Sequence, residues 1–296
     1  MASSEIWQQI LCNFRHRSFN IKKFCEWLDI NNLTPINIKI FVLDACMFAA
    51  YLYGCECWSS SIYEIKENIL ATERKLLKMI LQVKPSTPNE LLYVELGRCD
   101  VICRIKKRQK RFFERCKQLT DEDAILSRIM SLCTHLDFYK YYESLGDNLD
   151  QDNMTEMKNS INNATTTYCT RYKQMCGMKY NDCIYGQELR EDKRVIVTKW
   201  RLSSHNLKIE TGRYTTPTTP HAERVCSECV NSVEDEHHVV FQCPLYRNVQ
   251  IEHRDLLLKL KSIPEILNPM SIADANEIGD MLLKINDIRR DLGLCQ

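Results

Sequence analysis

Four residues of types that bind metal ions lie close together late in the chain, within VCSECVNSVEDEHHVVFQCPLY at 225–246. Cys226 and Cys229 form a C-x2-C pair, His238 follows after eight residues and Cys243 after four more. A tight turn at C-x2-C spacing aims two thiolates at one ion, and a Cys3His tetrahedron is a standard structural zinc set. The spacing therefore predicts a Zn²⁺ site that these four side chains fill, with no position left for water.

The separation of His238 and Cys243 places a condition on the chain between them. Residues five apart lie about 140° apart around a continuous α-helix, so the chain must bend to bring both to one ion. Pro244 suits the first position of a following helix, which would leave Cys243 at the cap, where the helix dipole favours a thiolate. His237 is the weaker ligand candidate because it lengthens the usual histidine-to-cysteine spacing. The alternative is a set of small buried thiols with both histidines solvated beside the acidic VEDE.

The chain contains 16 cysteines, and their meaning depends on the compartment. MASSEIWQQILCNFRHRS opens with no cationic region followed by an apolar run, so we expect an intracellular chain, in the cytoplasm or nucleus, with reduced thiols. The other cysteine groups lack a nearby fourth ligand in the sequence, and we interpret them as core residues. These groups are Cys55 with Cys57, Cys99 with Cys103, and Cys169, Cys176 and Cys183 at spacings of seven.

The elements that must position the cluster are predicted to be helices. The 296 residues include only 8 Gly and 8 Pro, and the apolar residues recur at helical rather than alternating spacing. The most apolar run, at 41–53, carries Asp44 and falls short of the ~20 residues that a membrane span needs, so it indicates a buried helix and no membrane partner. We expect an all-α fold with a small zinc-binding module.

A polar stretch at 147–167, rich in Asn, Asp and Thr, is typical of a linker or an exposed helix start. We place a domain boundary in or near it. The expected organisation is a thumb-like helical domain at 1–120 and an acidic, polar connector at 121–185. A basic helix with the zinc module follows at 186–250, and C-terminal helices complete the chain at 251–296.

The charge pattern is polarised although the net charge is only +1. Residues 101–118 hold eight Lys or Arg against one Glu, whereas 121–165 hold three basic against nine acidic residues. A basic run with interleaved Phe112 and Phe113 predicts either a solvated helix face or phosphate contacts. A second basic set before the cysteines favours the phosphate interpretation. The candidate contacts are Arg104, Lys106, Lys107, Arg108, Lys110, Arg111, Arg194, Lys199 and Arg201.

Several stretches together resemble the part of LINE-type, non-LTR retrotransposon reverse transcriptases that follows the polymerase palm. They are TPINIKIFVLDACMFAAYLYGCECW at 34–58, ATERKLLKMILQVKPSTPNELLYVELGR at 71–98, KRQKRFFERC at 107–116, HNLKIETGRY at 205–214 and the cysteine cluster. Their order and spacing also match, and the resemblance is weakest from about 121 to 190. It implies that the first stretches form a helical thumb and that Cys226, Cys229, His238 and Cys243 belong to a C-terminal CCHC zinc-binding region.

One departure from that family decides the functional expectation. The family's catalytic motif, an aromatic and a small residue followed by two aspartates, has no counterpart here, and neither does its endonuclease domain. No G-x-x-x-x-G-K, G-x-S-x-G or H-E-x-x-H motif occurs either. We therefore expect a non-catalytic chain without its polymerase, with no catalytic residues.

The resemblance implies nucleic-acid handling, in which RNA or DNA is held through its phosphates. The alternative is a protein-interaction or structural module in which the basic run pairs with the acidic 121–165 segment. A third possibility is an enzyme whose active site is supplied by a polymerase on another chain.

Overall fold

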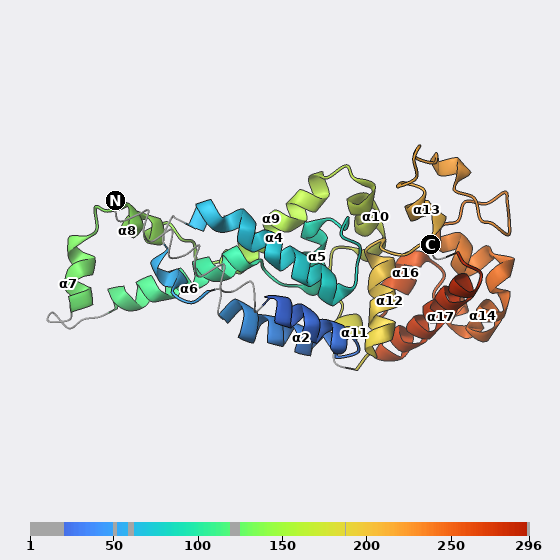
Figure 1. The fold of residues 1–296 in the computed structure, drawn as a ribbon, viewed down its shortest axis with the longest axis horizontal. Helices are drawn as coiled ribbons and strands as arrows, with labels where there is room; N and C mark the ends of the chain where they lie inside the picture. Colours follow the sequence, from blue (N-terminus) through green and yellow to red (C-terminus); the bar gives the residue numbers. More distant parts are fainter. Residues whose placement is uncertain (1–20, 50–51, 59–61, 119–124, 187, 295–296) are drawn as a thin grey trace. The chain divides into compact units, whose positions relative to one another are not determined.

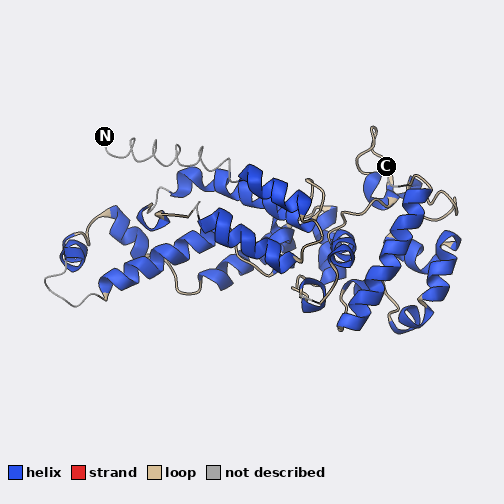
Figure 2. Ribbon diagram, turned by 60° about the horizontal axis from the view of Figure 1, so that its bottom comes forward, coloured by secondary structure: helices blue, strands red, loops and turns tan. Residues whose placement is uncertain are grey.

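The computed structural model describes residues 21–49, 52–58, 62–118, 125–186 and 188–294. Helices and helical turns make up most of this part of the chain (Figure 2). The described residues form no β-strand, and their single extended pairing is an isolated antiparallel bridge between Val225 and Val233. The predicted all-α fold is confirmed.

The first half of the described chain is a series of helices of uneven length (Figure 1). In order they are a helix over 21–30, α2 (Ile36–Val42), the π-helical turn η1 (Leu43–Phe48), η2 (Cys55–Cys57), α4 (Ile62–Leu81), α5 (Asn89–Leu96), α6 (Val101–Lys117), α7 (Ile125–Leu132), α8 (Asp137–Glu143) and α9 (Leu149–Asn163).

The second half consists of shorter helices before one long C-terminal helix. They are α10 (Thr167–Cys176), α11 (Asp182–Tyr185), α12 (Glu191–Arg201), α13 (Lys208–Thr211), η4 (His221–Glu223), η5 (His238–Gln242), η6 (Pro244–Tyr246), α14 (Arg247–Glu252), α15 (Arg254–Lys259), α16 (Ile263–Leu267) and α17 (Ile272–Asp291).

The chain divides into two compact units. Unit 1 comprises 1–32, 38–80 and 98–159, and unit 2 comprises 33–37, 81–97 and 160–296. The division falls at Asn159, within the polar 147–167 stretch where we expect a domain boundary. Of the two interpretations of this stretch, a linker or an exposed helix start, the structure has the helix, α9. Segment 81–97 belongs to unit 2 although it is distant from the rest of that unit in sequence.

Helix α6 of unit 1 carries the basic run. Asp100 caps it by accepting a hydrogen bond from the Cys103 amide at 2.8 Å. Val101 and Ile105 are fully buried, and Phe113 stacks on Tyr142 with ring centroids 5.5 Å apart. One face of α6 is thereby fixed in the core, and its basic residues occupy the remaining surface.

In unit 2, α12 packs against α17 more extensively than any other helix pair in the described chain (Figures 1 and 2). The two helices approach closely at Gly279, where an added Cβ would lie 2.5 Å from the Cβ of Lys193. Only glycine permits this approach without moving the Lys193 backbone. This contact fixes α12 in position for both the buried ion pairs and the hollow described below.

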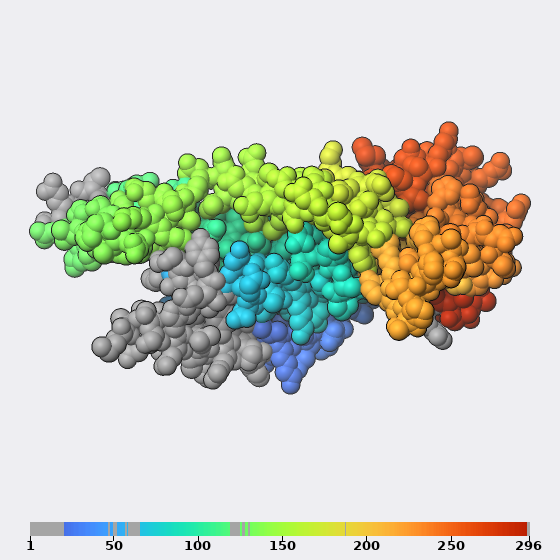
Figure 3. Space-filling view, turned by 90° about the horizontal axis from the view of Figure 1, so that it is seen from above, coloured from blue at the N-terminus to red at the C-terminus, as the bar shows by residue number. Residues whose placement is uncertain are grey.

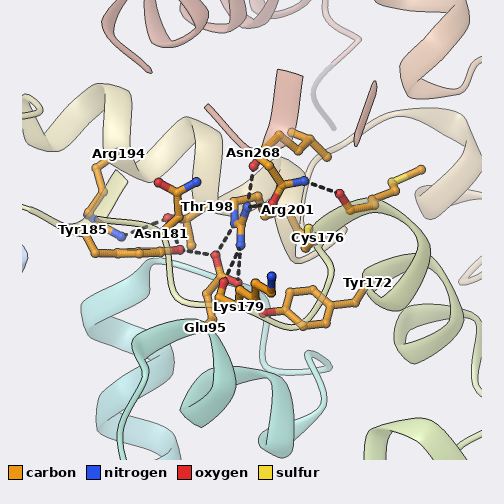
Figure 4. Close-up of polar contacts among 12 residues, drawn as sticks. Glu95, Tyr172, Cys176, Lys179, Asn181, Tyr185, Arg194, Thr198, Arg201 and Asn268 are labelled. Carbon is orange, nitrogen blue, oxygen red and sulfur yellow. Dashed lines mark hydrogen bonds and ion pairs between the residues drawn. The ribbon is translucent and has the colours of Figure 1, made fainter. Parts of the chain in front are cut away.

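A buried polar network joins α5 to α10, α11 and α12 (Figure 4). The Glu95 carboxylate is fully buried and pairs with Arg201, which is 1% exposed. The Tyr172 and Tyr185 hydroxyls each donate to that carboxylate at 2.5 Å. Burial, together with the Glu95 charge, raises the pKa of Tyr185 well above its usual value, so the phenol stays a proton donor. The network anchors segment 81–97 in unit 2.

A capping box at 87–90 is suggested by TPNE, but the structure does not form one. Helix α5 begins at Asn89, its cap residue is Pro88, and no side chain bonds to the free amides. The Thr87 hydroxyl is buried without a hydrogen-bond partner. The far end of α5 is a normal stop, because Gly97 adopts a left-handed φ of 59° and its amide bonds back to α5.

The segment between α13 and the cysteine cluster lies largely at the surface of unit 2. Most of residues 213–223 are exposed, and the orange residues of this region are visible in the space-filling view (Figure 3). Across the described residues, no helix combines the length and the hydropathy required to cross a bilayer.

Candidate metal centre

The chain bends between His238 and Cys243 in the way that their spacing requires. Residues His238–Gln242 form the π-type turn η5, closed by a hydrogen bond of 2.8 Å from the Cys243 amide to the His238 carbonyl. Cys243 itself is extended, with φ −70° and ψ 123°, and Pro244 starts η6. An i→i+5 turn followed by an extended residue brings these two side chains to the same place.

The other two cysteines lie on a short hairpin-like loop. The bridge between Val225 and Val233 pairs its two sides, and the Cys226 amide donates to the Ser232 carbonyl at 2.8 Å. At the tip, the Val230 amide bonds back to the Cys226 carbonyl at 3.1 Å. This turn points both thiols of the C-x2-C pair toward Cys243.

The sulfur separations match a tetrahedral zinc site. The Cys243 Sγ lies 3.7 Å from the Cys226 Sγ and 3.8 Å from the Cys229 Sγ. Zn–S bonds of ~2.3 Å at tetrahedral angles place two sulfurs about 3.8 Å apart, whereas a disulfide would hold them at about 2 Å. The ligand atoms of Cys226, Cys229, His238 and Cys243 all lie within 4.8 Å of one another.

His238 supplies the strongest independent sign that a ligand belongs here. Its side chain is 4% exposed, and neither ring nitrogen has a hydrogen-bond partner. A buried imidazole without partners is costly, since buried polar atoms are normally satisfied. Coordination of one nitrogen to a metal ion would remove this cost for that atom.

Two thiols of the cluster, those of Cys229 and Cys243, are poor acids without an ion. Burial, together with the neighbouring cysteines, raises the pKa of Cys243 to about 12, and burial raises the pKa of Cys229 as well. A divalent cation among three sulfurs reverses this effect because it stabilises the thiolates directly. The residues present therefore fit a structural Cys3His zinc centre, which would add fixed geometry rather than reactivity.

Acidic side chains, one half-buried and one buried, hold the cluster in place. Asp235 accepts a hydrogen bond from the His238 amide at 2.8 Å. Glu234 is 1% exposed, accepts from the Lys208 amide at 2.8 Å and pairs with Arg289 of α17. Arg289 also donates to the Tyr246 hydroxyl at 3.1 Å, so α17 is linked to both sides of the metal cluster.

Glu236 extends this support toward the rest of unit 2. Its carboxylate lies 2.8 Å from the His205 Nε2 and pairs with Arg171. Burial opposes its ionisation, but the hydrogen bond with His205 and the charge of Arg171 outweigh that effect and lower the pKa of Glu236 to about 2. Glu234 and Glu236 of the acidic VEDE segment are therefore internal. Of the two histidines that the alternative interpretation places in solvent, His237 is exposed and His238 is buried.

His237 is separate from the cluster. It is exposed, and its ring lies against Phe241 with centroids 5.2 Å apart. The sequence thus identified the right histidine of the pair. It missed Glu234 and Arg289, because their pairing joins residues 55 positions apart and no local pattern marks it.

A second cysteine group gains a neighbour that the sequence does not show. Cys99, Cys103 and Asp150 bring their ligand atoms within 4.8 Å of one another in unit 1. Their polar atoms already have partners: Cys103 donates to the Leu149 carbonyl at 3.2 Å, and the Lys107 ammonium binds the Asp150 carboxylate. This group has three candidate ligands and a cation beside its carboxylate, so we treat it as part of the α6–α9 contact.

Part of the basic run of α6 is paired with acidic residues of the segment that follows it. Lys107 contacts Asp150, Lys110 contacts Asp147, and Lys117 lies 3.2 Å from Glu143. These hydrogen bonds hold the pKa of Asp147 and the pKa of Asp150 below the usual range for aspartate. Three of the eight cations of α6 therefore join α6 to the connector in the folded protein.

Arg104 is also engaged internally. Its guanidinium binds Asp44 at 2.5 Å and the fully buried Glu73 at 2.6 Å. It also lies 4.6 Å from the centre of the Phe48 ring. A phosphate group would have to displace two carboxylates to reach Arg104.

The remaining basic residues of α6 face outward. Arg108, Arg111 and Arg115 are exposed, and Lys106 is half-buried. No ion pair is recorded for any of these four among the described residues, although the Arg108 guanidinium also contacts the Cys55 thiol.

The structure separates the three candidates of the second basic set. Arg194 is 1% exposed and pairs with Glu191 at 2.8 Å, and Arg201 is buried on Glu95 (Figure 4). Both are removed from the set of phosphate contacts, because a phosphate could reach them only if the core opened. Lys199 is half-buried beside an open hollow and stays a candidate.

Comparison of the chain with known protein families, with curated proteins and with solved structures returned no match. The protein is therefore classed by its fold and its candidate site alone. It is an all-α chain of two compact units, the second of which carries a candidate Cys3His metal centre.

Proposed function

We propose that the chain is a retroelement-derived, non-catalytic nucleic-acid-binding protein with a structural zinc centre in unit 2. The single observation that carries nucleic-acid binding is the exposed arginine stripe of α6, defined as Arg108, Arg111 and Arg115. The quoted resemblance to LINE-type reverse transcriptases supports the ancestry. The Cys3His cluster supports the zinc centre, although its geometry alone does not select the metal ion.

The arginine stripe has the spacing of one helix face. Residues at i, i+3 and i+7 lie on the same side of an α-helix, roughly opposite the buried Ile102 and Phe113. Guanidinium groups bind phosphate oxygens through two parallel hydrogen bonds, and they stay charged at any physiological pH. The stripe therefore suits the backbone of RNA or DNA, without selectivity for base sequence.

The experiment measures the dissociation constant of a fluorescent duplex and of a single strand across potassium chloride concentrations. Binding should weaken steeply with salt, and Arg108, Arg111 and Arg115 changed together to Gln should lower the log–log slope by about 2.7 for duplex DNA. The matched control changes Arg247, Arg254 and Lys261 of unit 2, which are exposed, to Gln. It removes the same charge, so an equal loss in the control would show that net charge and not the stripe is responsible.

A second candidate function is favoured by a specific observation. The pairs Lys107–Asp150, Lys110–Asp147 and Lys117–Glu143 join the basic run to the acidic segment within unit 1. This is the arrangement expected of a protein-interaction or structural module with a zinc clip and no nucleic-acid role. A salt-independent, weak affinity for every nucleic acid tested would favour this candidate over the first.

Ancestry also raises the possibility of a polymerase on another chain. The isolated protein should then show no primer extension. Addition of the chain to a reverse transcriptase of LINE type should reveal whether the chain changes the template binding of that enzyme. A positive result with the isolated chain would contradict the non-catalytic proposal.

A further inference from the structure

Unit 2 contains a hollow of about 270 Å³ that the metal centre does not use. It lies between the segment that follows α4, the end of α12, the loop after α12 and one residue of α17. Its polar lining comes mainly from Gln82, Lys84, Lys199, Ser204, Asn206 and Asn286. Positive and amide side chains gather there, and no carboxylate belongs to the lining.

The two lysines have spare hydrogen-bonding capacity. Lys84 Nζ donates to the His205 carbonyl at 2.8 Å, which leaves two of its three N–H groups. For the Lys199 ammonium, no hydrogen bond or ion pair is recorded in the described part of the chain. Ser204 accepts from the Lys84 amide at 2.7 Å, so its own hydroxyl proton remains to be donated.

The environment of both ammonium groups lacks a full counter-charge. Burial lowers the pKa of Lys199, and the charge of Arg194 lowers it further. Burial also lowers the pKa of Lys84, where Glu210 opposes the effect and Lys199 adds to it. An anion in the hollow would relieve the repulsion between the two lysines.

The backbone on both sides of the hollow adopts an unusual conformation. Gln82 has φ 56° and Ser203 has φ 50°, and these are two of the four non-glycine residues with positive φ in the described chain. The first lines the hollow, and the second directly precedes the lining residue Ser204. Left-handed non-glycine residues are costly and tend to occur where a site requires them.

We propose that this hollow is an oxyanion site that binds a phosphoryl group through Lys84 and Lys199, with the Ser204 hydroxyl as a neutral donor. Its volume is below the ~300–1,000 Å³ of drug-sized ligand sites, so a small anion with a short attached group fits better than a whole nucleotide. The absence of a lining carboxylate excludes a cation as the natural occupant.

The phosphoryl group has two possible sources, a nucleic-acid backbone or a small phosphate ester. The first source rests on the proposed nucleic-acid function, whereas the second does not. The hollow lies in unit 2 and the arginine stripe in unit 1, so their contributions can be removed separately.

The test is a titration of the full chain with inorganic phosphate at constant ionic strength, in which the ³¹P linewidth of the phosphate measures binding. Saturable binding is expected, and Lys199→Gln should raise the dissociation constant about tenfold or more, because one charge-assisted contact is lost. Lys84→Gln should act in the same direction. Lys199 is the cleaner position, since its ammonium makes no hydrogen bond or ion pair with the described residues, and Lys199→Arg should restore much of the binding.

Two control variants separate this site from the rest of the surface. Lys261→Gln, at an exposed lysine of unit 2, and the triple change of the arginine stripe should leave phosphate binding unchanged. Displacement of phosphate by a short oligonucleotide would identify the backbone as the source, and failure to displace it would identify a small ester. No saturable binding, or an equal effect of Lys261→Gln, overturns the proposal, whatever the stripe does to nucleic-acid affinity.

Discussion

The Cys243 amide donates a hydrogen bond of 2.8 Å to the carbonyl of His238, five residues earlier. This one bond converts a spacing that does not suit an α-helix into a geometry in which both side chains face Cys226 and Cys229. A π-type turn is uncommon and is therefore informative about the residues that it brings together. It is the local feature on which the metal centre depends.

The first prediction concerns the number of metal ions. The purified chain should hold one zinc ion, and Co²⁺ in its place should give the absorption bands of cobalt bound to thiolates. Cys243→Ser should reduce the metal content and destabilise unit 2, because metal binding at such a centre is coupled to folding. The measurements are metal analysis, visible spectroscopy and thermal unfolding.

Matched variants make this prediction specific. Cys103→Ser also changes a buried cysteine, and His237→Asn changes the neighbour of the proposed ligand; both should keep the metal. His238→Asn should weaken metal binding. Retention of a full ion in both Cys243→Ser and His238→Asn would place the metal elsewhere.

The second prediction concerns the buried pair of Arg201 and Glu95. Arg201→Leu should cost about 3–5 kcal/mol of unfolding free energy, because it leaves a fully buried carboxylate without its counter-ion. The double change Arg201→Leu with Glu95→Leu should cost less than the sum of the two single changes. Urea unfolding of the four proteins measures this coupling.

The Arg201→Leu variant also tests whether Arg201, which belongs to the second basic set, contacts nucleic acid. At a temperature where the variant stays folded, its nucleic-acid affinity should equal that of the unchanged protein. A selective loss of binding with no loss of stability would mean that Arg201 is accessible to phosphate, contrary to its burial.

The third prediction follows from the low pKa values of Asp147 and Asp150. Because the folded-state pKa lies below the unfolded one, these groups stabilise the fold at pH values above about 4, and the contribution is lost as the pH falls through the folded-state pKa. NMR titration of the carboxyl groups measures each pKa directly. Lys110→Gln should raise the pKa of Asp147, whereas Lys140→Gln, which removes an exposed lysine on α8, should leave it in place.

Local features of the sequence predicted much of the architecture. Helical spacing of apolar residues and Pro244 as a helix start each depend on a few neighbouring residues, and the structure has both. The four proposed metal ligands also come together, because C-x2-C spacing and a histidine near a cysteine are local patterns.

Long-range pairing was not predictable in the same way. Glu95 and Arg201 lie 106 residues apart, so nothing local distinguishes this buried arginine from the solvated Arg190. The capping box at Thr87 is not formed: the hydroxyl is buried without a hydrogen-bond partner, and no side chain caps α5. Sequence composition identified the basic segments but not the carboxylates that each basic residue contacts.

The last prediction separates the two candidate functions by the change in nucleic-acid affinity that one double variant produces. Asp147 and Asp150 changed together to Asn would release Lys110 and Lys107 from their carboxylates. If the chain binds nucleic acid, two more cations become available beside the arginine stripe, so affinity should rise and the log–log salt slope should steepen by up to about 1.8 for duplex DNA. If the pairs serve only to hold unit 1 together, the same change should lower thermal stability and leave affinity unchanged. Asp255→Asn with Asp287→Asn in unit 2 removes equal charge, and a similar gain in affinity there would attribute the effect to net charge alone.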